Sequence, residues 1–80
     1  MNEVLTGMIG EILRGVRRRK KIKLKDVARK TRESISGVCA VERGERNINV
    51  STLFKFLRAL DMSFQDFAAE MGEPSNEEKE

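Results

Sequence analysis

Apolar residues along this chain recur at the three- to four-residue spacing that places them on one face of a helix. Residues 3–20 hold seven such positions, close to one face of an amphipathic helix: Val4, Leu5, Met8, Ile9, Ile12, Leu13 and Val16. We therefore predict a first helix from about Glu3 to Lys20. Gly7, Gly10 and Gly15 lower its intrinsic propensity by up to about 1 kcal/mol each relative to alanine, so packing must hold this helix.

Residues 23–47 have the pattern of two short helices that meet at a sharp bend. Val27 and Ala28 are the apolar pair of the first, and Val38 and Val41, three residues apart, lie on one face of the second. Because each helix is too short to be stable alone, the two must bury these residues against each other and a third element. Ala28 is expected where the two helix axes approach most closely, since a larger side chain would hold them apart.

The ends of these two helices are marked by residues that favour helix ends. The first helix is expected at residues 24–30. The second begins at Ser34 or Ser36, either of which is a good N-cap, and ends near Arg43. Gly44 follows and can adopt the left-handed conformation that often terminates a helix.

Two further helices are predicted in the second half of the chain. One covers residues 50–60 and is capped by Asn49 or Ser51. Its inward positions are Leu53, Phe56, Leu57 and Leu60. After a short break, Ser63 opens a capping-box-like start of a fifth helix, which continues to about Met71.

Charge is distributed unevenly along the chain. Between Arg14 and Arg32, eleven Lys and Arg residues stand against one acid, Asp26, a balance of +10 over nineteen residues. This is too lopsided for a solvated face balanced by its own ion pairs, so we favour a polyanion partner, most often nucleic acid. Residues 73–80, with four Glu and one Lys, are a predicted disordered acidic tail after one domain of residues 1–72. The tail could shield the basic face, although a solubilising role is the simpler interpretation.

The sequence contains no histidine and one cysteine, Cys39. Metal clusters, histidine-based catalysis and an internal disulfide are therefore disfavoured, and we expect no cofactor, no metal and no enzymatic activity. Cys39 is interpreted as a small packing residue, with oxidation control as the alternative, because a reactive thiol needs exposure and an activating environment. No apolar run approaches membrane-spanning length and no signal peptide opens the sequence, so a cytoplasmic protein without a membrane partner is expected.

These patterns resemble one family, the lambda-repressor/Cro-like (XRE-type) helix-turn-helix domain of bacterial and phage regulators. The residues that carry the resemblance are Ile9-Gly10, Leu13-Arg14 and Arg17, then Val27-Ala28, then Val38, Val41-Glu42-Arg43-Gly44 and Arg46-Asn47, then Thr52-Leu53, Ala59-Leu60 and Ser63-Phe64. The run from Glu42 to Ile48 is especially similar to the controller proteins of restriction–modification systems. The resemblance implies an all-α fold of five helices, which binds double-stranded DNA through its helix-turn-helix.

The resemblance also implies which residues meet DNA. The third helix would present four residues to the major groove: Ile35, Ser36, Gly37 and Ala40. Contacts to the DNA backbone would come from Lys23, Lys25, Arg43, Arg46 and Asn47. Bidentate recognition of guanine or adenine needs Arg, Lys, Asn or Gln, which the major-groove set lacks. We infer that selectivity rests largely on DNA shape, or that base recognition has been lost.

The chain departs from the family at two places. Lys23 stands where relatives have a capping residue, at a cost of about 1 kcal/mol. Arg32 and Glu33 replace the glycine and apolar residue of the usual turn. A left-handed conformation without glycine is strained, so the turn is expected to differ in shape or the second helix to run longer. Ile35 is expected to fill the space of the missing apolar residue.

Arg17 has two interpretations. The resemblance pairs it with Glu42 in a partly buried ion pair, which would fix the angle between the third helix and the first. The simpler interpretation makes Arg17 one more phosphate-facing cation of the basic run. We favour the pair, although a buried pair is weak evidence of net stability.

Five large apolar residues exceed what a core of this size readily hides: Phe54, Met62, Phe64, Phe67 and Met71. We therefore predict a homodimer through the fifth helix and its neighbours, as in many relatives, although any single one of these residues could equally belong to the core. The leading functional hypothesis is a transcriptional regulator, a dimer on an inverted repeat with the third helix in the major groove. The alternative is a protein-interaction module that kept the fold and binds a toxin or an RNA polymerase subunit.

Overall fold

A computed structural model of the protein describes residues 3–72, and the regular structure within them is entirely helical. The helices are α1 (Glu3–Arg19), α2 (Leu24–Thr31), α3 (Ile35–Glu42), α4 (Val50–Ala59) and α5 (Phe64–Glu70). This confirms the predicted all-α fold of five helices, and the helix ends differ from the expected ones by about a residue, which is ordinary for helix termini. Within residues 3–72, no helix combines the length and the apolar character needed to cross a bilayer. The predicted disorder of residues 73–80 concerns residues outside the described range.

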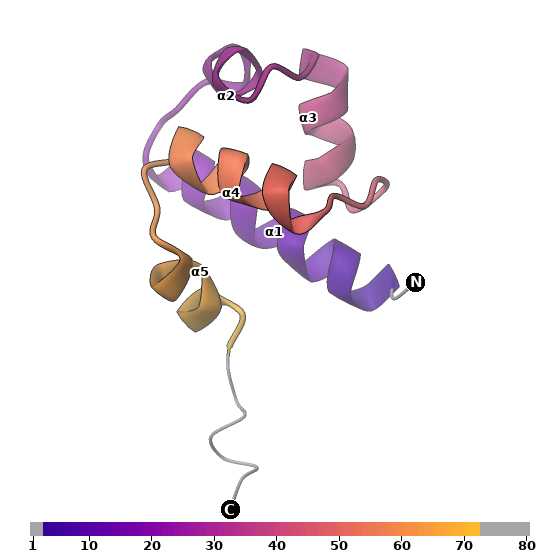
Figure 1. Cartoon of the computed structure of the whole chain (residues 1–80), viewed down its shortest axis with the longest axis vertical. Helices are drawn as coiled ribbons and strands as arrows, with labels where there is room; N and C mark the ends of the chain where they lie inside the picture. Colours follow the sequence, from indigo (N-terminus) through magenta and orange to yellow (C-terminus); the bar gives the residue numbers. More distant parts are fainter. Residues whose placement is uncertain (1–2, 73–80) are drawn as a thin grey trace, which may run out of the picture.

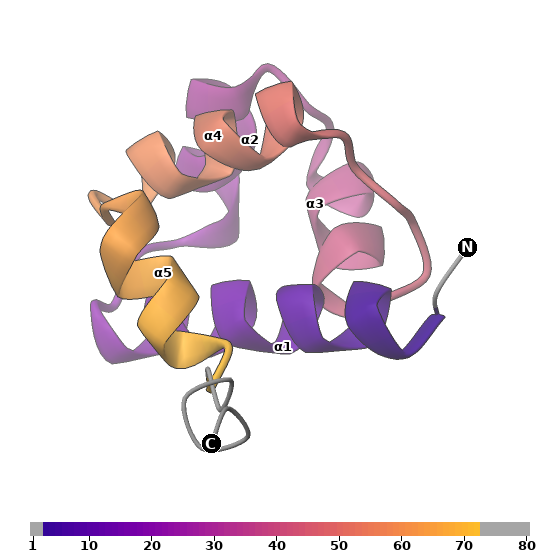
Figure 2. The ribbon, with the colours of Figure 1, turned by 60° about the horizontal axis from the view of Figure 1, so that its bottom comes forward.

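α1 is the longest helix, and α3 packs directly against it (Figure 1). In Figure 2, α1 runs along the bottom, with α3 above its first half and α5 beside its other end. α2 packs against both α3 and α4, and α4 leads through a short link into α5. The helix-turn-helix pair α2–α3 is therefore held from below by α1 and from the side by α4.

The core is assembled from apolar residues of all five helices. Its buried members are Leu13, Val16, Val27, Ala28, Val38, Val41, Leu53, Phe56, Leu57, Ala59, Leu60 and Phe67. The pairs Val27–Ala28 and Val38/Val41 are therefore buried as their spacing predicted. Among residues 3–72, the buried polar side chain is Thr31, whose hydroxyl donates to the carbonyl oxygen of Val27 over 2.7 Å. This hydrogen bond removes the cost of burying the hydroxyl.

Side-chain caps begin three of the helices. The hydroxyl of Ser34 accepts from the Gly37 N–H over 2.9 Å at the start of α3, and Ser63 and Asn49 do the same for α5 and α4. At α2 the capping position is Lys23, which has the extended conformation of a cap but makes no side-chain hydrogen bond. α2 therefore lacks a side-chain cap, as the sequence predicted, and packing must compensate for the missing hydrogen bond.

The turn between α2 and α3 keeps the left-handed conformation despite lacking glycine. α2 is one residue longer than expected, and Arg32 then adopts φ +62°. The N–H of Glu33 reaches the carbonyl oxygen of Ala28 over 3.0 Å, which closes the end of α2. The expectation of a differently shaped turn is therefore wrong: the packing of α2 and α3 imposes the left-handed conformation, at a cost of about 1–2 kcal/mol for a residue with a Cβ atom.

A close approach between α1 and the end of α3 occurs at Gly10. A Cβ atom on Gly10 would lie 2.2 Å from the carbonyl oxygen of Val41 and 2.7 Å from that of Glu42, which is too close for any side chain. One turn earlier, Gly7 lies beneath Gly44, where a Cβ atom on Gly44 would come within 2.8 Å of the Gly7 Cα. Gly10, which looked unfavourable for a helix, is therefore the residue of α1 that lets the end of α3 approach.

Candidate nucleic-acid interface

The beginning of α3 is the exposed part of the helix-turn-helix pair. Ile35 and Ser36 are exposed, Ile35 by half of its surface, while Gly37 and Ala40 are half-buried. The expectation that Ile35 fills space inside the turn is wrong, because the buried side chain beside the turn is Thr31. The first turn of α3 therefore offers one hydroxyl and one branched apolar side chain to a partner.

An ion pair fixes the other end of α3 to α1. Arg17 Nε donates to Glu42 Oε2 over 2.7 Å and Arg17 Nη2 to Oε1 over 3.1 Å, so that the guanidinium and the carboxylate meet side by side. Arg17 Nη1 also donates to the carbonyl oxygen of Ile22 over 3.1 Å. The two side chains are only 14% and 7% exposed, so Arg17 does not face solvent as a phosphate-binding cation would. This pair links α1, the loop before α2 and the end of α3.

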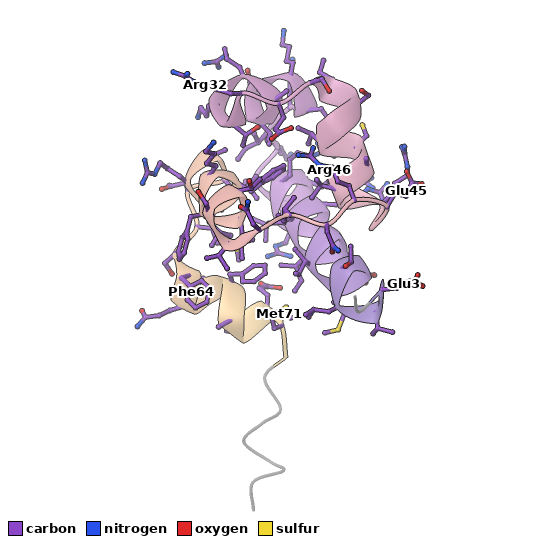
Figure 3. The ribbon with its side chains drawn as sticks, turned by 45° about the vertical axis from the view of Figure 1, so that its right-hand side comes forward. Glu3, Arg32, Glu45, Arg46, Phe64 and Met71 are labelled. Carbon is purple, nitrogen blue, oxygen red and sulfur yellow. The ribbon has the colours of Figure 1, made fainter. Side chains whose placement is uncertain are left out.

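A second ion pair crosses the beginning of α3. Arg46, in the loop after α3 (Figure 3), donates to Glu33 of the turn, with 2.9 Å between Nη1 and Oε1. This hydrogen bond and the charge of Glu33 raise the pKa of Arg46. Gly37 lies beneath the pair, because a Cβ atom there would come within 3.1 Å of Arg46 Nη1. Gly37, one of the four residues predicted to face the major groove, thus also makes room for Arg46.

The other residues predicted to contact the DNA backbone differ in whether they interact with another side chain of the protein. Lys23 and Lys25 are exposed at the start of α2, and neither forms an ion pair within residues 3–72. Arg43 donates to Glu45 over 3.1 Å, and this hydrogen bond, with the charge of Glu45, raises the pKa of Arg43. Asn47 accepts a hydrogen bond from the hydroxyl of Thr6, which ties the loop to α1.

The basic stretch found in the sequence is largely unpaired in the structure. Of the eleven Lys and Arg residues between positions 14 and 32, three form ion pairs within the described chain: Arg17, Arg19 and Arg29. Lys20 instead donates to the carbonyl oxygens of Leu60 and Asp61. Most of the positive charge is therefore available to an external anion.

The five residues predicted to form a dimer interface do not share one environment. Phe54 and Phe64 are 45% and 50% exposed, with ring centroids 5.5 Å apart. Phe67 is 4% exposed and belongs to the core, so its assignment to an outer interface is wrong: the docking of α5 turns this ring inward. Met62 and Met71 are half-buried and pack against the core. The exposed aromatic patch consists of Phe54 and Phe64, and Figure 3 shows Phe64 on the outer side of α5.

Other chemistry is sparse in the described part of the chain. Cys39 is free and half-buried on α3, in keeping with a packing role. Residues 3–72 contain no group of three or more Cys, Asp or Glu side chains placed to hold a metal ion.

Five helices, with α2 and α3 joined by a short turn and the start of α3 exposed, define a helix-turn-helix domain. The chain belongs to the helix-turn-helix family, whose model matches residues 13–67, well over half of its length. This confirms the family resemblance found in the sequence. No curated protein matches the chain significantly.

Three solved structures share the fold. A point mutant of the restriction–modification controller protein C.Esp1396I has a TM-score of 0.83 and 20% identity over 91% of this chain and 92% of that chain. The controller protein C.AhdI from Aeromonas hydrophila has a TM-score of 0.74 and 28% identity, covering 80% and 97% respectively. The C.Esp1396I tetramer in complex with its natural 35 base-pair operator has a TM-score of 0.73 and 21% identity over 84% and 93%. The resemblance to controller proteins thus extends over most of both chains.

Proposed function

We propose that this protein is a transcriptional regulator that binds double-stranded DNA, with the beginning of α3 in the major groove. The observation that carries the proposal is the exposed first turn of α3, held on a fixed frame beside the free cations Lys23 and Lys25. In helix-turn-helix proteins this turn meets base edges while the flanking cations neutralise phosphates. The controller protein C.Esp1396I, which shares the fold, is known as a complex with its operator, and this supports the same use here.

Sequence preference in this proposal comes from few direct contacts. Ser36 bonds a base edge or a phosphate, and Ile35 and Ala40 pack on thymine methyl groups. Arg43 and Asn47 follow the DNA backbone, while Arg46 holds the turn through Glu33. DNA shape then carries much of the discrimination.

The proposal includes a homodimer on an inverted repeat. Two copies of α3 would enter successive major grooves about 34–36 Å apart, so a symmetric operator would match a symmetric protein. The exposed rings of Phe54 and Phe64 supply an apolar patch on α4 and α5 for the twofold contact.

The first test is fluorescence anisotropy of a labelled duplex of mixed sequence, titrated with the protein at several salt concentrations. We expect the logarithm of the binding constant to fall linearly with that of the salt concentration, with a slope of about −0.9 for each neutralised phosphate. Replacing both Lys23 and Lys25 with alanine should reduce the slope by about two such contacts. An absence of binding even at low salt would overturn the proposal.

Base recognition is tested separately by selecting preferred sites from a random duplex pool. Ser36→Ala should change the selected sequence, because it removes the one hydroxyl of α3 predicted to meet base edges. Ser51→Ala, which removes an exposed hydroxyl from α4, is the matched control and should select the unaltered site. If Ser36→Ala left both affinity and preference untouched, α3 would not be recognising bases at this position.

A second candidate function follows from the ion pairs around α3. Both cations expected to follow the DNA backbone after α3, Arg43 and Arg46, are engaged by Glu45 and Glu33. This favours a protein-interaction module that uses the same surface for a toxin or an RNA polymerase subunit. The salt titration separates the two candidates, because only a DNA-binding protein shows a steep salt dependence with a duplex.

A further inference from the structure

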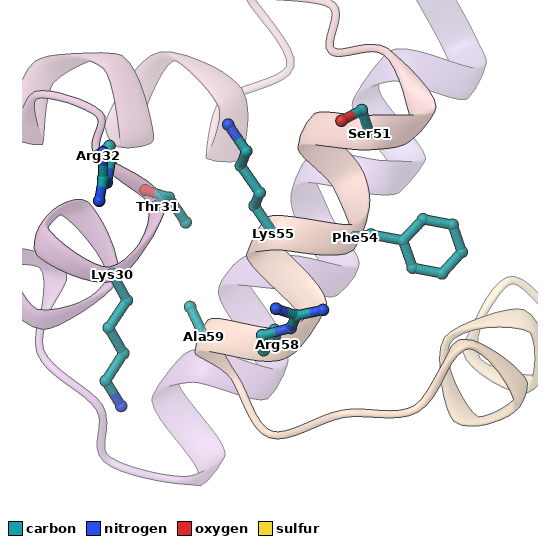
Figure 4. A pocket seen from close by; sticks show the side chains of 8 residues that line it. All are labelled: Lys30, Thr31, Arg32, Ser51, Phe54, Lys55, Arg58 and Ala59. Carbon is teal, nitrogen blue, oxygen red and sulfur yellow. The ribbon is translucent and has the colours of Figure 1, made fainter.

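A basic groove lies between α2 and α4, on residues that the proposed DNA contacts do not use. Its volume is about 850 Å³ and its lining is Lys30, Thr31, Arg32, Ser51, Phe54, Lys55, Arg58 and Ala59. In Figure 4, Lys30 and Arg32 lie on the α2 side, and Lys55 and Arg58 project from α4, while the Phe54 ring points away from α2. Four cations thus line one concave surface without a carboxylate among them.

These four cations have no partner of their own. None forms an ion pair or a side-chain hydrogen bond within residues 3–72, whereas five other arginines of the described chain are paired. Like charges that line one groove repel each other unless an anion lies between them. The groove therefore favours an anionic occupant.

The size and shape of the groove favour a narrow anion over a wide one. Its volume lies in the range of pockets for small ligands or short chain segments. A DNA duplex is too wide to enter a gap between two packed helices, whose axes lie about 8–10 Å apart. A single extended chain that carries carboxylates fits both the volume and the charge.

We propose that this groove binds the acidic segment formed by residues 73–80 of the same chain. The segment carries four Glu and one Lys, a charge of −3 opposite the +4 of the groove cations. Being tethered, it is present at an effective concentration of the order of millimolar, which lets individually weak exposed ion pairs act together.

The segment begins near the end of α4 that lines the groove. α5 has seven residues, about 10 Å in length, and a link of residues 60–63 joins it to the end of α4, where Arg58 lines the groove. Glu70 pairs with Arg19 over 3.0 Å, and the next residue, Lys20, donates to the carbonyl oxygen of Leu60 over 2.8 Å. The end of α5 is therefore close to the end of α4. Eight extended residues span up to about 26–29 Å from that point.

The competing site for the segment is the basic end of α1. Arg14 and Arg18 are exposed there without an ion pair in the described chain, but they stand on the convex surface of one helix. The groove offers cations to a chain from both α2 and α4, whereas α1 offers them from one helix only. The segment is therefore expected in the groove and not on α1.

The test is paramagnetic relaxation enhancement on the full chain without DNA. A nitroxide is attached at Ser75→Cys in a Cys39→Ser background. The intensities of the backbone amide signals are then compared between the protein with the paramagnetic label and the same protein with the reduced, diamagnetic label. At low salt we expect loss of intensity at Arg32, Ser51 and Lys55. Amides of α1 also lose intensity, because the Glu70–Arg19 pair places the start of the segment beside α1. Raising the salt concentration to about 1 M, where the screening length is about 3 Å, should restore the signals of the groove residues.

Two variants and a mixing experiment make the result decisive. Lys55→Gln with Arg58→Gln should abolish the loss at the groove residues, whereas the matched double change Arg14→Gln with Arg18→Gln should leave it intact. No loss of intensity at the groove residues, or a loss there that is indifferent to the groove variant, would overturn the proposal. A loss that appears only when spin label and isotope are on different chains would overturn its intramolecular form.

One consequence rests on the proposed function. If the protein binds DNA, deleting residues 73–80 should raise its affinity for any duplex several-fold at low salt. Without the acidic segment, the groove cations are no longer neutralised and attract the DNA phosphates. The relaxation experiment is done without DNA. Its result therefore tests the groove proposal even if the protein does not bind DNA.

Discussion

The contact between α1 and α3 depends on the absence of one methyl group. At Gly10 the backbone carbonyl groups of Val41 and Glu42 occupy the space of a Cβ atom. Carbonyl groups at the end of a helix cannot move as the tip of a flexible side chain can, so a substitution must separate the two helices. Such overpacking typically costs about 1–3 kcal/mol.

Gly10→Ala is therefore expected to destabilise the protein by about 1–3 kcal/mol, even though alanine favours helix formation. Gly7→Ala is the matched control on the same helix, because nothing lies within 4 Å of its Cβ position. This control should stabilise the protein by up to about 1 kcal/mol through helix propensity. Urea unfolding followed by circular dichroism measures both. Equal effects of the two substitutions would contradict the close approach at Gly10.

The sequence pattern does not specify which of two similar residues is buried or closely packed. Gly10 and Gly15 look alike in the sequence, yet only Gly10 faces a neighbouring helix closely. Phe64 and Phe67 are both aromatic and three positions apart, and the docking of α5 alone decides that Phe67 is buried and Phe64 exposed. Such distinctions depend on the angle between helices, which the pattern of a single helix does not contain.

At the scale of elements, prediction succeeded where the determining interactions are local. Helix ends could be predicted because a cap such as Ser34 bonds an N–H only three residues away. The hydrogen bonds from Arg46 to Glu33 and from Thr6 to Asn47 join residues 13 and 41 positions apart, so no local pattern specifies them. The Arg17–Glu42 contact was inferred from family resemblance, which carries long-range information that periodicity lacks.

The Arg17–Glu42 pair is expected to couple α1 and α3 energetically. Replacing either residue alone with methionine leaves the other charge largely buried without its partner, at a cost of about 3 kcal/mol or more. Replacing both removes that charge and should recover much of the loss. A double-mutant cycle from urea unfolding measures the coupling.

The exposed pair Arg19–Glu70 provides a control for this cycle. It joins α1 to α5 with side chains 61% and 39% exposed, so solvent screens it strongly. Its coupling energy should fall between about 0 and 1 kcal/mol. Similar coupling in both cycles would mean that burial adds nothing to the Arg17–Glu42 pair, and the pair would then not be what holds α3 at its angle.

At the scale of the whole molecule, a domain of this size buries little apolar surface. An 80-residue chain hides somewhat more than about 60% of the surface of its unfolded form, which leaves stability marginal unless the protein associates. Phe54 and Phe64 place two half-exposed rings side by side on α4 and α5. Covering them in a dimer would stabilise the fold by mass action and fix the spacing of the two α3 helices.

We therefore expect the dimer to depend on these two rings more than on other exposed apolar residues. Phe64→Ser should weaken self-association by at least about tenfold, or 1.4 kcal/mol, in sedimentation equilibrium, with little effect on folding because the ring is half exposed. Ile35→Ser is the matched control, since Ile35 is equally exposed but lies on α3. Phe67→Ala is unsuitable, because removing this buried ring would itself unfold the domain. If Ile35→Ser dissociated the dimer and Phe64→Ser did not, the twofold contact would lie over α3. A contact there would keep DNA away from the start of α3. Both the proposed interface and the proposed mode of DNA binding would then have to be abandoned.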